Sequence, residues 1–137
     1  MELCDQGDLT DFIEMRHAVN PETQRCILSA AEAQYVVQSI VKGLAFLSSN
    51  QIMHRDIKLD NIFVRLKNPA MQPHVKELPI DSFEFKLGDF GLAKKFKTSD
   101  DIHLTFVGTP LNMGPEVLNK EPYTEKADVW SLGTVLF

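Results

Sequence analysis

Residues 54–63 read HRDIKLDNIF, a cluster of charged and amide side chains that leads directly into an apolar pair. This pair begins the run IFVRL at residues 62–66, whose length and composition predict a short β-strand. A second run, FEFKL at residues 83–87, alternates apolar and polar side chains with the period of a strand. We expect the two runs to form a hairpin with a long tip, which would bring Asn61 and Asp89 close together.

A long helix is expected before this hairpin, over residues 29–50. Ser29 and Glu32 have the spacing of a capping box, in which each side chain accepts a hydrogen bond from the other residue's backbone N–H. Asn50 marks the expected C-terminal end of the helix. The apolar stripe that should face the core consists of Val36, Val37, Ile40, Val41, Leu44 and Leu47.

The remaining segments carry weaker signals. We expect a shorter helix over residues 7–17, with Asp8 near its N-terminus, and an apolar helix over residues 125–137. Residues 20–28 form a connection or a weak helical turn. Residues 67–82 and 91–115 contain several prolines and glycines without a sustained period, which predicts loops. This order of elements indicates a mainly α fold with a small β-hairpin.

Composition narrows the classes of function. The chain has 137 residues and a net charge of −5, which argues against a broad nucleic-acid-binding surface. Its two cysteines, Cys4 and Cys26, give neither a disulfide framework nor a metal-ligand spacing, as is typical of a reduced cytoplasmic protein. No apolar run reaches the ~18 residues that a membrane span needs. We therefore expect no nucleic-acid partner, no membrane span and a cytoplasmic location.

Three motifs follow one another in a fixed order. The sequence HRDIKLDN at residues 54–61 matches the pattern H-R-D-x-x-x-x-N, and Asp89-Phe90-Gly91 matches D-F-G. Further on, the chain reads GTP at residues 108–110, GPE at 114–116 and DVWSLG at 128–133. Each short pattern is weak evidence alone, whereas the complete set in this order is specific.

With these motifs the chain resembles the large lobe of eukaryotic-type serine/threonine protein kinases over essentially its whole length. The resemblance implies that residues 1–137 are a partial catalytic domain, running from the hinge between the lobes to the start of the central large-lobe helix. The small lobe and the last helices of the large lobe would be absent. The implied reaction is transfer of the ATP γ-phosphate to a Ser or Thr hydroxyl of a protein substrate, with Mg²⁺ as cofactor.

The resemblance gives the HRDIKLDN and DFG residues the catalytic roles. Asp56 would accept or orient the proton of the substrate hydroxyl, and Lys58 would contact the transferred phosphate. Asn61 and Asp89 would hold magnesium, because their side chains supply the oxygen ligands that this cation prefers.

The nucleotide contacts implied by the resemblance begin at the N-terminus. Glu2 and Cys4 would offer backbone groups to adenine. Phe63, Lys58 and the magnesium ligands would complete the contacts to the bound nucleotide.

Other motif residues receive structural roles from the same resemblance. His54 would pack against Phe90 of the DFG motif, next to Gly91. Asp128 would anchor the backbone of residues 54–61 from the start of a helix, where an aspartate is favourable. Glu116 would pair with an arginine farther downstream, and Gly114 replaces the alanine usual before Pro-Glu, a change that looks conservative.

Three residues receive regulatory roles. Thr105, four residues before Thr109, matches the activation-loop phosphorylation site of the family. Arg55 would contact the phosphate on that loop. Thr109 would hydrogen-bond near Asp56, which favours a Ser or Thr acceptor.

Residues 1–137 contain no G-x-G-x-x-G phosphate loop, which the family carries in its small lobe. Two interpretations follow: a piece of a catalytic serine/threonine kinase, or a non-catalytic kinase-like binding module. The intact catalytic and magnesium residues favour the first. A small-molecule phosphotransferase is a third, but such enzymes usually lack the Arg-Asp-x-Lys context and the G-T-P loop. We expect the isolated 137 residues to be a poor catalyst and only marginally stable.

Overall fold

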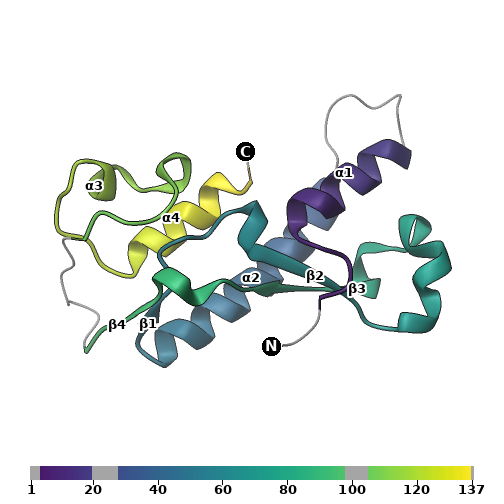
Figure 1. Cartoon of the computed structure of the whole chain (residues 1–137), viewed down its shortest axis with the longest axis horizontal. Helices are drawn as coiled ribbons and strands as arrows, with labels where there is room; N and C mark the ends of the chain where they lie inside the picture. Colours follow the sequence, from purple (N-terminus) through teal and green to yellow (C-terminus); the bar gives the residue numbers. More distant parts are fainter. Residues whose placement is uncertain (1–3, 20–27, 98–104, 137) are drawn as a thin grey trace.

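The computed structural model describes residues 4–19, 28–97 and 105–136 (Figure 1). Its α-helices are α1 (Leu9–Val19), α2 (Ala30–Ser49), α3 (Pro115–Leu118) and α4 (Lys126–Thr134). Its strands are β1 (Ile52–Met53), β2 (Ile62–Leu66), β3 (Phe83–Leu87) and β4 (Lys94–Lys95). Short 3₁₀ segments are η1 (Leu59–Asn61), η2 (Pro69–Glu77), η3 (Ile80–Ser82), η4 (Phe90–Leu92) and η5 (Pro110–Asn112).

Two antiparallel strand pairs organise the centre of the molecule. β2 pairs with β3, from Ile62 opposite Leu87 to Leu66 opposite Phe83, which confirms the expected hairpin and its bounds. β1 pairs with β4, with Met53 opposite Lys94. The second pair was not predicted, because strands of two residues are too short to show a period in the sequence.

The segment before α1 lies along the other edge of β2. The backbone N–H of Gln6 donates to the carbonyl of Val64 (3.1 Å), and the N–H of Val64 donates to the carbonyl of Gly7 (2.9 Å). Gly7 has φ +73°, a left-handed conformation that suits glycine. The helix expected over residues 7–17 therefore begins later, at Leu9, because Gly7 belongs to the strand-like segment.

Helix α2 confirms its predicted ends. The Ser29 side chain accepts from the Glu32 N–H (3.3 Å), and the Glu32 carboxylate accepts from the Ser29 N–H (2.8 Å), so the capping box is complete. The Asn50 N–H donates to the carbonyls of Phe46 and Leu47 and closes the last turn. Val41, expected in the buried stripe, is 47% exposed, because it lies at the rim of a groove between α2 and α4.

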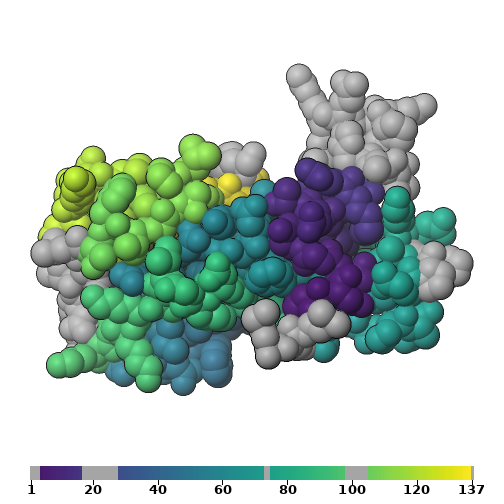
Figure 2. Space-filling view, viewed as in Figure 1, coloured from purple at the N-terminus to yellow at the C-terminus, as the bar shows by residue number. Residues whose placement is uncertain are grey.

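Two apolar clusters form the core. The hairpin cluster joins α1, α2, β2 and β3, and its aromatic centre packs edge to face, with Phe12 at 4.8 Å from Phe83 and 5.5 Å from Phe85 between ring centroids. The loop cluster comes from the segments near β1, β4, α3 and α4, and consists of Met53, Phe96, Met113, Val117, Tyr123 and Ala127. Figure 2 shows residues 105–125, in yellow-green, at one end of the molecule, and α1 and η2 at the other.

Two regions expected as loops contain short ordered segments. In residues 67–82, the Asn68 side chain accepts from the Ala70 N–H (3.1 Å) and starts η2, and Leu78 is buried in the hairpin cluster. Residues 91–115 include β4 and η5. Consecutive 3₁₀ turns need no 3.6-residue apolar pattern, so no helical period is visible in the sequence of η2 or η5. Within the described ranges, no helix has the length and apolar character needed to cross a membrane.

Candidate active site

The site lies on two loops that are each held at both ends by the strand pairs. Residues 54–61 connect β1 to β2, and residues 88–93 connect β3 to β4. Because β1 pairs with β4 and β2 pairs with β3, the two loops begin and end side by side. The Gly88 N–H donates to the Asn61 carbonyl (2.9 Å), and the Arg55 Nε donates to the Leu92 carbonyl (2.7 Å).

His54 joins the two loops from inside. Its side chain is fully buried, and its ring lies 5.1 Å from the ring of Phe90 at an interplanar angle of 61°. Its Nε2 lies 2.8 Å from the Gly88 carbonyl, which can only accept, so Nε2 carries the proton. Nδ1 is then the acceptor for the Asp56 N–H (3.4 Å). Both ring nitrogens of His54 therefore lie within hydrogen-bond distance of backbone groups, one on each of the two loops.

Asp56 lies among three polar partners at the junction of the loops. Its Oδ1 accepts from the Thr109 hydroxyl (2.7 Å), and its Oδ2 accepts from the Asn61 Nδ2 (2.9 Å). The Lys58 Nζ lies 3.4 Å from the same Oδ2. Sequence reasoning expected Thr109 near Asp56, and the structure shows that contact.

The surroundings of Asp56 favour its ionised form. Burial raises the pKa of this carboxyl, but the hydrogen bond from Thr109 and the charge of Lys58 outweigh that effect. The hydrogen bond from Asn61 acts in the same direction, so the pKa lies below its ordinary value. Asp56 is therefore a carboxylate that can orient a hydroxyl group and accept its proton.

Asn61 and Asp89 each have a side-chain oxygen that accepts no hydrogen bond from the described residues. The Asn61 amide nitrogen donates to the Asp56 carbonyl (2.7 Å) and carboxylate, which orients the side chain and leaves its oxygen available. Asp89 is exposed, with a left-handed backbone at φ 54°, and its Oδ1 accepts from the Gly91 N–H (3.1 Å). Carboxylate and amide oxygens are suitable Mg²⁺ ligands. No larger His, Cys, Asp and Glu group that could hold a metal occurs in the described residues.

Of the residues expected to contact the nucleotide base, Phe63 lies on β2. Phe63 pairs with Asp8 across an isolated bridge, and its ring edge lies against Gly88, where any Cβ would clash with it. Sequence reasoning missed Gly88, which must be a glycine for Phe63 to approach it. Cys4 is partly buried at the start of the described chain, and Glu2 lies outside the described residues.

Helix α4 holds the first loop through Asp128. This residue is only 4% exposed, and its carboxylate accepts from the backbone N–H groups of His54 (2.7 Å) and Arg55 (2.8 Å). Burial raises the pKa of Asp128, and the two donors offset this only in part. These bonds stabilise a loop in which Arg55 has φ 69°, an unusual conformation for a residue other than glycine.

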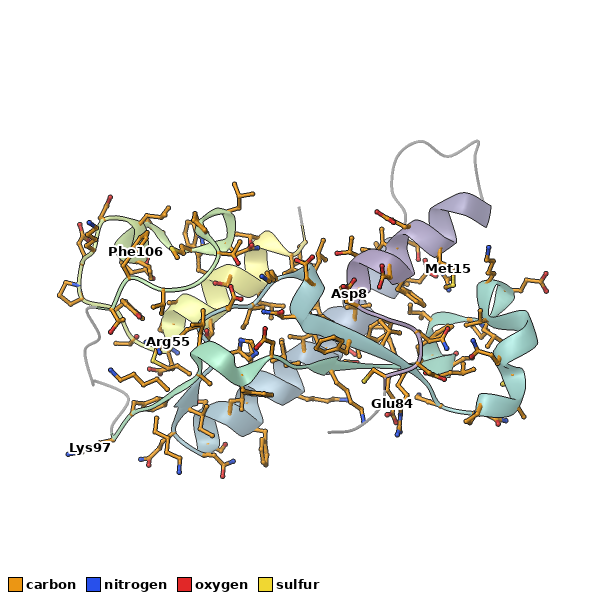
Figure 3. The ribbon with its side chains drawn as sticks, viewed as in Figure 1. Asp8, Met15, Arg55, Glu84, Lys97 and Phe106 are labelled. Atoms are coloured by element: carbon orange, nitrogen blue, oxygen red, sulfur yellow. The ribbon has the colours of Figure 1, made fainter. Side chains whose placement is uncertain are left out.

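The expected regulatory residues are only partly brought together. Arg55 lies beside the start of α4 (Figure 3), and its buried Nη1 has no hydrogen-bond partner among the described residues. Thr105 is exposed, and its carbonyl accepts from the Tyr123 hydroxyl (2.7 Å). None of the contacts described for these ranges joins Arg55 to Thr105.

Two glycines in the motifs permit close approaches. Gly108 has φ +113°, and a Cβ there would lie 2.5 Å from the Arg55 carbonyl oxygen, so the third motif runs directly against the first. A Cβ at Gly114 would lie 2.6 Å from both carboxylate oxygens of Glu116. These oxygens are the far end of a flexible side chain, so Glu116 can turn away from an alanine at residue 114 at little cost. In the described part of the chain, no partner of the Glu116 carboxylate is seen.

Comparison with known proteins gives a consistent match. The family model described as "Protein kinase domain" matches residues 1–137. Serine/threonine-protein kinase 33 of Bos taurus is 33% identical over 138 residues, covering 100% of this chain and 25% of its own length. Serine/threonine-protein kinase unc-51 of Caenorhabditis elegans is 34% identical over 137 residues, covering 100% of this chain and 14% of its own length. Serine/threonine-protein kinase atg1 of Dictyostelium discoideum is 36% identical over 140 residues, covering 100% of this chain and 17% of its own length. The chain thus spans a quarter or less of these relatives.

Proposed function

Because the chain belongs to the protein kinase family, we propose that it is part of a serine/threonine kinase that transfers the ATP γ-phosphate to a protein hydroxyl. The observation that carries this proposal is the environment of Asp56. Its carboxylate is held between Thr109, Asn61 and Lys58 and is kept ionised. We also propose that these residues form part of the large lobe of the kinase domain.

In the proposed reaction, Asp56 orients the acceptor hydroxyl and takes up its proton as the phosphate is transferred. Thr109 fixes one oxygen of the carboxylate and leaves the direction of the other to Asn61 and Lys58. Lys58 lies close enough to Asp56 to place a positive charge beside the transferred phosphate.

Asn61 and Asp89 are the residues that we propose to hold Mg²⁺. When bound, the cation neutralises the charge of the ATP phosphates. The chain's own contribution is to present these two side chains from loops joined by the Gly88–Asn61 hydrogen bond. The segment around Cys4, together with Phe63, is proposed to contact the nucleotide base.

We further propose that a phosphate on Thr105 pairs with Arg55. The unpartnered and buried Nη1 of Arg55 supports this role, because a buried guanidinium nitrogen without a partner is costly. We also propose a cytoplasmic location, which the low number of cysteines in the sequence supports.

The test is phosphotransfer by the full-length protein, measured with Mg-ATP and a degenerate Ser/Thr peptide library. Asp56→Asn should lower kcat by about 10²–10⁴-fold, the range of a general base. Asp60→Asn is the matched control, since Asp60 is an exposed aspartate of the same loop, and its kcat should stay within about twofold. Absence of phosphotransfer by the wild-type protein contradicts the proposal and favours a non-catalytic binding module. Equal activity of Asp56→Asn and the wild type contradicts the role proposed for Asp56.

A further inference from the structure

Asn112 ties the loop that carries Thr109 to helix α4. Its amide nitrogen donates to the Thr134 hydroxyl (2.6 Å), which in turn donates to the Ser131 carbonyl (2.7 Å). The Ser131 hydroxyl donates to the Asn112 carbonyl (2.7 Å). Asn112 is thus bonded to helix α4 twice, through its side chain to Thr134 and through its backbone carbonyl to Ser131.

The other side chains of η5 contribute little to holding this loop in place. Pro110 is exposed and Leu111 is 89% exposed, so Asn112 is the only residue of η5 whose side chain is partly buried. The segment before η5 depends on it, because the Asn112 N–H donates to the Thr109 carbonyl (2.9 Å). A shift of Asn112 would therefore move Thr109.

The same helix also holds the loop on the opposite side of the contact. Asp128 accepts from the backbone of His54 and Arg55, and Asp128, Ser131 and Thr134 follow one another at intervals of three residues along α4. Residues three apart lie on neighbouring turns of one helix face. The two loops are therefore connected twice. They are connected directly by the hydrogen bond between Thr109 and Asp56, and indirectly through α4, which bonds the first loop at Asp128 and the second at Asn112.

We infer that Asn112 is a positioning residue, which together with Thr134 and Ser131 holds the Thr109 hydroxyl against Asp56. Helix α4 then fixes the two loops relative to each other, one through Asp128 and the other through Asn112. The inference rests on the proposed function for its effect on catalysis, whereas the structural link exists in the chain itself. Sequence reasoning missed Asn112, because its partners become visible only when η5 lies against α4.

The first experiment measures amide hydrogen exchange in the full-length protein. Thr134→Val removes the hydroxyl that bonds Asn112, and Thr134→Ser keeps it and serves as the matched control. In Thr134→Val, the amides of Asn112 and Met113 in the η5 turn should exchange about three- to tenfold faster, as expected for loss of one neutral hydrogen bond. The amides of His54 and Arg55, which Asp128 holds, should change by less than about twofold. Unchanged exchange at Asn112 and Met113 overturns the inference.

The second experiment measures phosphotransfer with Mg-ATP and a Ser/Thr peptide. Thr134→Val and Asn112→Ala should each lower kcat by about three- to tenfold and leave the KM for ATP within about twofold, with wild-type kcat in Thr134→Ser. In a Thr109→Val background, Thr134→Val should have no further effect on kcat, because its action passes through Thr109. Additive losses, or an equal loss in Thr134→Ser, overturn the inference. Absent wild-type phosphotransfer contradicts the proposed function, and the exchange experiment then decides the inference alone.

Discussion

The hairpin cluster and the loop cluster are held by different forces. The hairpin cluster packs large aromatic and aliphatic side chains, with Phe12 and Phe83 almost fully buried. Around the loop cluster, hydrogen bonds from α4 at Asp128, Ser131 and Thr134 fix the neighbouring loops. Burial of apolar surface is non-directional, whereas hydrogen bonds depend on angle and distance. The first region therefore supplies stability, and the second sets the positions of the candidate catalytic groups.

The largest expected effect comes from removing an aromatic ring from the hairpin cluster. Phe83→Ala should lower the free energy of unfolding by about 3–5 kcal/mol, because it leaves a cavity beside Phe12. Urea unfolding of the full-length protein, followed by circular dichroism, measures this. Phe46→Ala is the control, since Phe46 is 67% exposed, and it should change stability by less than about 0.5 kcal/mol. Equal losses in the two variants would show that burial does not distinguish these sites.

A substitution that keeps the shape of a side chain should lower the free energy of unfolding more where hydrogen bonds hold the structure than where apolar packing does. Asp128→Asn replaces one acceptor oxygen with a donor that faces a backbone N–H, so unfolding free energy should fall by about 1–3 kcal/mol. Leu66→Met keeps the apolar volume in the hairpin cluster, and Leu66 is 2% exposed, so its loss should stay below about 1.5 kcal/mol. Urea unfolding tests both, and a larger loss in Leu66→Met than in Asp128→Asn would reverse the comparison.

The smallest expected effect concerns pH and the start of α2. Burial raises the pKa of Glu32, but hydrogen bonds from Ser29 and the charge of Arg16 outweigh this effect, so the folded pKa lies below the ordinary value. The Arg16 Nη2 lies 2.6 Å from the Glu32 Oε1. A carboxyl with a lowered folded pKa stabilises the fold above its unfolded pKa, and this contribution is lost as pH falls through the folded pKa. Stability measured against pH should therefore fall less steeply on the acid side in Glu32→Gln. Identical slopes for Glu32→Gln and wild type would contradict this.

The two regions also differ in what the sequence could predict. The β2–β3 hairpin and the capping box of α2 were predicted with their bounds, because period and capping are properties of neighbouring residues. The β1–β4 pair was not, because its strands of two residues lie far apart in the chain. Asp128 was expected beside residues 54–61 only through the family resemblance.

The remaining site residues depend on contacts between distant segments. Gly88 matters because the Phe63 ring approaches its backbone, and Asn112 matters because its side chain bonds Thr134. Neither residue type is distinctive at its position in the sequence. The prediction that Val41 is buried was wrong for a related reason. Its spacing fits the apolar stripe of the helix, but the groove between α2 and α4 leaves its side chain exposed.

The attachment of both loops to both strand pairs has a consequence for ligand binding. Ordering the backbone of one residue costs about 1–2 kcal/mol of conformational entropy. Residues 54–61 and 88–93 are already ordered by the paired strands and by bonds such as that from Gly88 to Asn61. A ligand that binds between these loops does not have to immobilise them, so more of its contact energy remains as affinity.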